Sequence, residues 1–191
     1  MPLTKDGDVD QVEDAAGEED AMDPASKLER VREAQRIVGE LVWLVTRCRP
    51  DLMYALNRMA VWTTKQPGRV VSLAPQVWRF LAQSRNEGLT FPRGDGVFGD
   101  IEVFTDASFG EECQGCVVLK WAGSPILWKS SRQTIQTTST AGAELFEIME
   151  GATKSEATRV IAEGLRGDKV MTSLCANSLV FRWLRIWEPK H

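Results

Sequence analysis

The stretch IEVFTDAS, residues 101–108, decides how the second half of the chain is interpreted. Its β-branched and aromatic residues are typical of a strand. Asp106 is a carboxylate in this otherwise apolar strand, where burial costs free energy unless something pairs with the charge. It is therefore either a turn-forming aspartate at a strand end or part of a polar site.

The residues around this strand predict a mixed sheet with helices packed on it. Three consecutive strands followed by helix, strand and helix favour that arrangement, in which we expect a tight turn at 123–125 between the second and third strands. The predicted elements are strands at 101–108, 116–123 and 124–131, a helix from about 139 to 164 that is either continuous or broken near Gly151, a strand at 168–176 and a helix at 177–187.

The first half of the chain predicts helices instead. SKLE at 26–29 is a capping box that indicates a helix start at Ser26, and Pro50 ends that helix near Cys48. A second helix ends before Pro67, and a third runs from about Ser72 to Gly88. Three tryptophans lie on apolar helix stripes and are expected in the core: Trp43, Trp62 and Trp78.

Charge is distributed unevenly along the chain. The 191 residues carry a net charge of −4, with 43% hydrophobic and 26% charged residues, which excludes a wholly disordered protein. Residues 1–25 hold nine acids and one lysine, whereas residues 26–93 hold five acids and twelve bases. The acidic part predicts a disordered leader, and the basic part is compatible with a polyanionic partner.

The sequence also excludes several classes of protein. It has neither a run of eighteen apolar residues nor an apolar signal segment, so we expect an intracellular protein, cytoplasmic or nuclear, that does not contact membranes. Cys113 and Cys116 form a CxxC, but the one histidine is His191, so reduced thiols are expected in place of a zinc site. The lack of an internal histidine also excludes a Ser–His or Cys–His catalytic pair.

Five longer segments resemble a known family. IVGELVWLVTRCRPDLMYALNRM (37–59) and VWRFLAQSRNEGLTF (77–91) resemble the helical segment that follows the palm in copia-type retrotransposon reverse transcriptases. VFTDASFG (103–110), GSPILWKSSRQTIQTTST (123–140) and AELFEI (143–148) are similar to the ribonuclease H domain fused downstream in the same polyproteins. The segments occur in the order of that family.

The resemblance implies a fold and an organisation. It implies an α/β protein leaning to α+β, with a helical unit followed by an incomplete ribonuclease H-like mixed sheet and flanking helices. The expected parts are a leader at 1–25, a segment at 26–90 like the reverse-transcriptase connection, and a truncated ribonuclease H-like domain at 99–187.

The resemblance also implies a chemistry. The family hydrolyses the RNA strand of RNA–DNA hybrids with two Mg²⁺ ions held by four carboxylates. Asp106 matches the carboxylate on the first strand and Glu144 the one on the first helix, so both are the implied metal ligands and catalytic residues. Lys129, in the third strand, and Arg132 and Gln133, in the connector after it, are candidate contacts to a nucleic-acid backbone; the alternative is that they are solvated loop residues.

Two ligand positions of the family are not matched. The third falls in Cys175–Ala176–Asn177, where Ala176 has no ligand atom, and the fourth is not reached before His191. We therefore expect a domain with impaired nuclease activity. The alternatives are a nuclease with a replacement carboxylate, a non-catalytic nucleic-acid-binding module and a helical interaction protein. The other nearby carboxylates are expected at the solvated surface: Glu102, Glu147 and Glu150.

Overall fold

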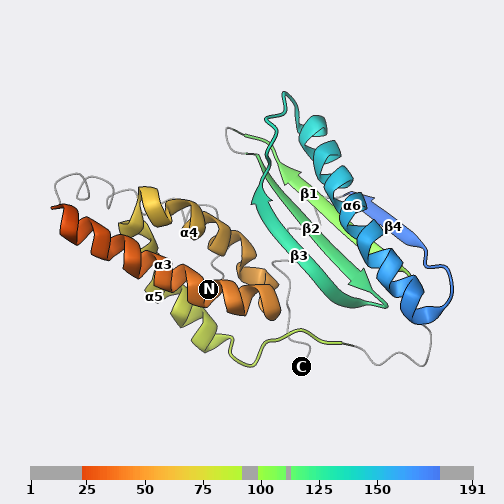
Figure 1. The fold of residues 1–191 in the computed structure, drawn as a ribbon, viewed down its shortest axis with the longest axis horizontal. Helices are drawn as coiled ribbons and strands as arrows, with labels where there is room; N and C mark the ends of the chain where they lie inside the picture. The colour runs from red at the N-terminus through yellow and green to blue at the C-terminus, as the bar shows by residue number, and fades with distance from the viewer. Residues whose placement is uncertain (1–22, 92–98, 111–112, 177–191) are drawn as a thin grey trace. The chain divides into compact units, whose positions relative to one another are not determined.

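The computed structural model describes residues 23–91, 99–110 and 113–176. They belong to two compact units, one ending at Gly88 and one beginning at Leu89. The described residues form four α-helices and a four-stranded mixed sheet, which confirms the expected α/β class (Figure 1).

The first helix begins earlier than predicted. α3 spans Pro24–Arg47, and its N-cap is Asp23. The Asp23 carboxylate accepts hydrogen bonds from the backbone N–H groups of Ala25 (3.0 Å) and Ser26 (3.1 Å), and the Ser26 hydroxyl also donates to it. The capping box at Ser26 was therefore a wrong prediction. Proline favours the earlier start, because its fixed φ suits the first helical position and its missing N–H needs no partner there.

Prolines also begin the next two helical segments. A 3₁₀ turn, η2 (Pro50–Leu52), leads into α4 (Met53–Lys65). α5 spans Pro67–Gln83, so it begins before the predicted Ser72 and ends before the predicted Gly88. The proline in its first turn acts as the start signal that the prediction missed.

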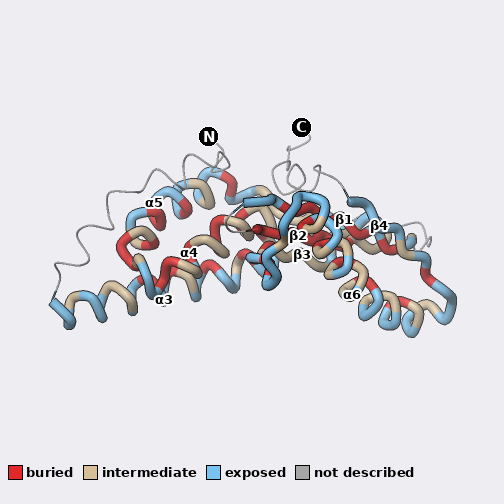
Figure 2. Tube along the Cα trace, turned by 90° about the horizontal axis from the view of Figure 1, so that it is seen from above, coloured by how far each residue is buried: buried red, intermediate tan, exposed pale blue. Residues whose placement is uncertain are grey.

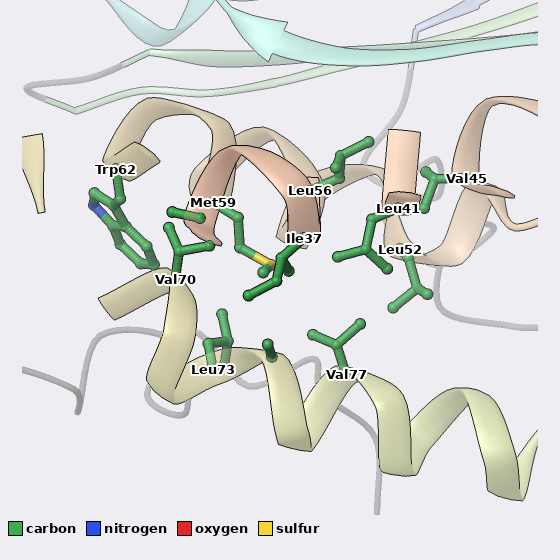
Figure 3. Close-up of a cluster of buried hydrophobic side chains, with 12 residues drawn as sticks. Ile37, Leu41, Val45, Leu52, Leu56, Met59, Trp62, Val70, Leu73 and Val77 are labelled. Carbon is green, nitrogen blue, oxygen red and sulfur yellow. The ribbon is translucent and has the colours of Figure 1, made fainter. Parts of the chain in front are cut away.

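The helical unit buries an apolar core of its own. Figure 3 shows side chains from α3, η2, α4 and α5 pointing into one cluster. Trp62 is 6% exposed, as predicted, but Trp43 and Trp78 are 68% and 39% exposed, so their predicted burial was wrong. Trp43 lies two positions after buried Leu41, which puts it on the far side of α3. The buried members are Ala34, Ile37, Leu41, Val45, Leu52, Leu56, Met59, Trp62, Val70, Leu73, Ala74 and Val77.

A buried arginine joins the turn after α3 to the end of α5. Arg49 is 5% exposed, and its Nε and Nη2 donate to the two oxygens of Asp51 at 2.9 and 2.7 Å. Arg49 Nη2 also donates to Ser84 Oγ at 2.8 Å, and the guanidinium lies 5.3 Å from the centroid of the Phe80 ring. A buried charge is tolerated only when paired in this way, so the contacts fix the turn against α5.

Four strands form one mixed sheet in the second unit. The strands are β1 (Ile101–Ser108), β2 (Gln114–Trp121), β3 (Ser124–Arg132) and β4 (Thr172–Ala176). Their order is β3-β2-β1-β4, in which β1 and β4 are parallel and the other pairs are antiparallel. β1 is thus a central strand, which explains why Ile101, Val103 and Ala107 are buried.

The hairpin between β2 and β3 turns one position earlier than predicted. Its loop is Ala122 and Gly123, with positive φ values of 50° and 75°. A two-residue loop with positive φ at both positions matches the twist of the flanking strands. Pro125, which the prediction placed both at the end of the turn and in the third strand, belongs to β3, an edge strand, where a missing N–H is tolerated.

A single long helix covers one face of this sheet. α6 spans Thr140–Arg166, and Ser139 caps it by accepting a hydrogen bond from Gly142 N at 3.1 Å. Of the two alternatives left open by the sequence, the helix is continuous and has no break at Gly151. A Cβ at Gly151 would lie 2.5 Å from Thr105 Cγ2, so the glycine allows α6 to approach β1 closely. Figure 2 shows buried and exposed residues alternating along the helices, as expected for helices with one packed face.

Some predicted elements lie outside the described residues. They include the leader up to residue 22 and the final helix at 177–187. Within residues 23–91, 99–110 and 113–176, no helix is both long and apolar enough to cross a membrane.

The close packing at Gly151 gives a matched pair of substitutions. Gly151→Ala is expected to lower the free energy of unfolding by about 1–3 kcal/mol, because the new methyl group collides with β1. Gly164→Ala, on the same helix but with no atom within 4 Å of the new Cβ, is expected to raise it by about 0.5–1 kcal/mol through helix propensity. Urea denaturation followed by circular dichroism measures both, and equal effects would contradict the packing role.

Candidate functional site

Asp106 lies near the carboxyl end of β1 and is 9% exposed. Its Oδ1 accepts a hydrogen bond from the backbone N–H of Ala107 at 2.9 Å, and it pairs across the sheet with Cys116. The neighbouring Thr105 faces α6 at Gly151. Because side chains alternate along a strand, Asp106 points to the opposite face of the sheet.

The parallel pairing of β4 brings Ala176 to the same place. Ala176 is the register partner of Thr105, so it stands beside the residue that precedes Asp106. Parallel strands end at the same edge of a sheet, and the carboxyl end of β4 therefore adjoins the carboxyl end of β1. The methyl group of Ala176 offers no ligand atom at this position.

Glu144 lies near the same end of the sheet, on α6. Gly151 packs over Thr105, while Glu147 lies over Gly115, the cross-strand partner of Ala107. Toward its N-terminus, α6 therefore runs toward the carboxyl end of β1. Glu144 lies one helical turn beyond Glu147 in that direction. Its side chain is exposed, whereas that of Asp106 is buried. The fold brings the two elements together, but the carboxylates differ in face and in exposure.

Another carboxylate of α6, which was predicted to lie at the surface, is buried. Glu147 is 3% exposed, so its predicted solvation was wrong. Its carboxylate occupies the space left by Gly115, where a Cβ would be 1.7 Å from Glu147 Oε2. Gln133 Nε2 donates to Glu147 Oε2 at 3.1 Å and to the carbonyl oxygen of Ala143 at 2.8 Å. Of the other two carboxylates expected at the surface, Glu102 is exposed and Glu150 is half-buried.

The spacing along α6 contained a signal for this burial. Ala143, Glu147, Gly151 and Ser155 recur every four residues and are all buried. Three of the four are small, as expected where a helix packs closely on a sheet. A glutamate inside such a stripe of small residues points toward the sheet.

Burial dominates the electrostatics of Glu147. Removal from water raises the pKa of Glu147, and the negative charge of Glu150 adds to this effect. The hydrogen bond from Gln133 and the charges of Lys129 and Lys154 oppose it. The side chain therefore retains its proton to a higher pH than an exposed glutamate does.

The thiol of Cys116 is affected by both buried carboxylates, Asp106 and Glu147. Burial raises the pKa of the Cys116 thiol, and the negative charges of Asp106 and Glu147 raise it further. The thiol is 0% exposed and stays protonated at neutral pH, so it is a poor nucleophile. All four cysteines are free thiols: Cys48, Cys113, Cys116 and Cys175.

The three predicted nucleic-acid contacts differ in their surroundings. Lys129 Nζ donates to Glu150 Oε1 at 2.5 Å, and Lys154 Nζ lies 3.4 Å from the same oxygen. Gln133 is 8% exposed, and its amide bonds inside the protein, so it positions α6 instead of facing a ligand. Arg132 is exposed at the end of β3.

The donors at this end of the sheet do not fit a pair of Mg²⁺ ions. Among the residues that the structure describes, no three His, Cys, Asp or Glu side chains are grouped so that they could hold a metal. Asp106 and Glu144 lie on different faces, Glu147 is directed onto Gly115, and Ala176 has no donor. Mg²⁺ needs several converging oxygen ligands, and these four positions do not supply them.

Comparison with known proteins adds no family to this description. No family model matches the sequence, and no solved structure matches the fold significantly.

The buried Glu147 predicts a pH-dependent stability. The folded-state pKa of Glu147 is raised above the ordinary 4.5. The stability contributed by the protonated side chain is therefore full below pH 4.5 and is lost as the pH rises through the folded-state pKa. Glu147→Gln, which cannot ionise, is expected to exceed the wild type in free energy of unfolding at pH 8, where the wild type must bury a charged carboxylate. The difference is expected to shrink toward pH 4.

Thermal and urea unfolding across pH 4–8 measure this effect, with the exposed Glu144→Gln as the matched control. A wild-type stability that follows the same pH profile as Glu147→Gln would contradict the assignment.

Proposed function

We propose that the second unit is a ribonuclease H-like domain of copia-type retroelement origin that binds RNA–DNA hybrids and lacks a competent two-metal centre. The observation that carries this proposal is the register of β1 and β4, which places Ala176 beside Thr105 and Asp106. The resemblance assigns a carboxylate to the end of the fourth strand, and this position adjoins the first-strand carboxylate.

The arrangement of the elements supports the proposal independently of any single residue. The resemblance assigns ligands to the first strand, the first helix and the end of the fourth strand of the sheet domain. Here β1 and β4 are adjacent and parallel, and α6 packs on β1. Such convergence is what a site at the carboxyl end of a central strand requires.

The side chains at the implied ligand positions support a loss of two-metal hydrolysis. Two Mg²⁺ ions activate a water molecule and stabilise the leaving oxygen only when carboxylates fix both ions. One of the implied positions is Ala176, and Asp106 and Glu144 do not converge on one face. Hybrid hydrolysis through two metals is therefore not part of the proposed function.

Binding is the activity that the proposal retains. Arg132 is exposed at the end of β3, and Lys129 lies nearby with 35% of its side chain exposed. Residues 26–93 add an excess of basic groups, with twelve bases against five acids. Basic side chains at these positions suit the phosphates of a nucleic-acid backbone.

A cleavage assay on a labelled RNA–DNA hybrid tests the proposal. The 191-residue chain is expected to bind the hybrid more weakly as salt rises, while RNA cleavage in Mg²⁺ stays at background. Ala176→Asp is expected to leave cleavage far below that of an active ribonuclease H, because the carboxylates still do not converge. Robust Mg²⁺-dependent cleavage that Asp106→Asn abolishes would overturn the impairment, and absence of hybrid binding would overturn the proposed function.

A further inference from the structure

The helical unit contains a long stretch with several bases and no acid. Residues 65–85, which we call the basic segment, comprise the last residue of α4, all of α5 and the two residues after it. They include four bases and neither aspartate nor glutamate. Lys65, Arg79 and Arg85 are exposed, and Arg69 is half-buried. The basic segment therefore presents positive charge to its surroundings.

The helices that contain these bases do not neutralise them. On a helix surface, ion pairs form between residues three or four positions apart. Because α4 and α5 contain no acid at any position, they offer Lys65 and Arg79 no such partner. By contrast, Arg36 of α3 pairs with both Glu33 and Glu40. The basic segment is thus suited to an anionic partner from elsewhere.

An anionic segment of matching length is attached to the same unit. Residues 1–22, which we call the acidic segment, lie outside the described residues and carry eight acids and one lysine. They lead directly into Asp23, the N-cap of α3. Their side-chain charge of −7 opposes the charge of +4 on the basic segment. At physiological salt such charges attract each other over about 8 Å, so the attraction acts where the two segments touch.

The acidic segment is long enough to reach the basic segment. A chain of its length spans up to about 70 Å when it is extended. α3 and α5 are about 36 and about 25 Å long, and they pack in the same core (Figure 3). Because the acidic segment is attached at the N-terminal end of α3, every position of α5 lies within its span.

We propose that the acidic segment docks on the basic segment of the same chain and competes there with the phosphates of a nucleic-acid strand. The tether keeps the local concentration of the acidic segment at about 1 mM. Non-specific contacts between proteins and nucleic acids have dissociation constants of about 0.1 mM or below, and a similar value here favours the docked form by about tenfold. Both ligands are polyanions, so they exclude each other from the same bases. The competition rests on the proposed function, whereas the docking does not.

Zero-length cross-linking of the full chain tests the docking. A water-soluble carbodiimide joins a carboxylate to a lysine amine that it touches, and Lys65 is the one lysine of the basic segment. Mass spectrometry is expected to find carboxylates of the acidic segment joined to Lys65, and about 1 M salt is expected to abolish this product. A mixture of isotope-labelled and unlabelled protein distinguishes products within one chain from products between two chains. Lys27, which closely follows the acidic segment, is the internal reference for cross-linking through sequence proximity.

A matched pair of double substitutions leaves Lys65 in place as the reporter. Arg79→Gln/Arg85→Gln removes two exposed charges from the basic segment and is expected to lower the yield of the Lys65 cross-link more than about twofold. Arg32→Gln/Arg47→Gln removes two exposed charges from α3 and is expected to leave that yield unchanged. Absence of the Lys65 cross-link, equal yields in the two variants, or products that join only different chains would overturn the docking.

A fluorescently labelled RNA–DNA hybrid tests the competition. Replacement of the eight acids of the acidic segment by asparagine or glutamine is expected to tighten hybrid binding, measured by anisotropy, about tenfold. The same segment in scrambled order keeps its charge and is expected to bind the hybrid like the wild type. Saturating hybrid is also expected to suppress the Lys65 cross-link of the wild type while that of Lys27 persists.

The outcomes separate the docking from the proposed function. A wild-type chain that binds the hybrid and keeps its full Lys65 cross-link would overturn the competition and leave the proposed function standing. A chain that forms the Lys65 cross-link but binds no hybrid, even with the acids replaced, would overturn the proposed function and the competition while the docking stands.

Discussion

The close approach of α6 to β1 is the constraint on which the sheet unit depends. It is possible because Gly151 has no side chain where the helix meets Thr105 and Val103. Because α6 lies this close to the sheet, the residue one turn earlier on the helix, Glu147, also reaches the sheet, where it fills the space over Gly115. One small residue on the helix and one on the sheet therefore set the environment of a buried carboxylate and, through Gln133, anchor the start of α6.

The helical unit depends on a different kind of contact. Its core is apolar, but its turn after α3 is held by a buried charge, with Arg49 joined to Asp51 and Ser84. Buried ion pairs define geometry more than they add stability, because desolvation offsets most of the attraction. The two units thus position a helix by different contacts. In the sheet unit a glycine, Gly151, lets the helix pack closely, and in the helical unit a buried charge, Arg49, bonds to the end of the helix.

The existence and type of most described elements could be predicted from the sequence, because apolar periodicity and turn residues act locally. Their boundaries depended on caps that compete locally, as Asp23 and Ser26 do, and on prolines that begin helices as well as end them. The site was less predictable. Asp106 stood out as a polar residue in a strand, but the burial of Glu147 requires knowing that Gly115 lies opposite it. The position of Gly115 opposite Glu147 is set by tertiary packing, and in the sequence only the spacing of small residues along α6 indicated it.

The parallel pairing of β1 with β4 has a consequence for the order of events on the ribosome. Ile101 pairs with Thr172, and two strands and the 27-residue α6 separate these partners along the chain. The sheet is therefore incomplete until β4 has emerged from the exit tunnel, whereas the core of the helical unit is already complete at Val77. Contacts between distant residues form slowly. During translation the helical unit is able to fold first. Until β4 is available, the edge of β1 that pairs with it stays unpaired and can bond to strands of other chains.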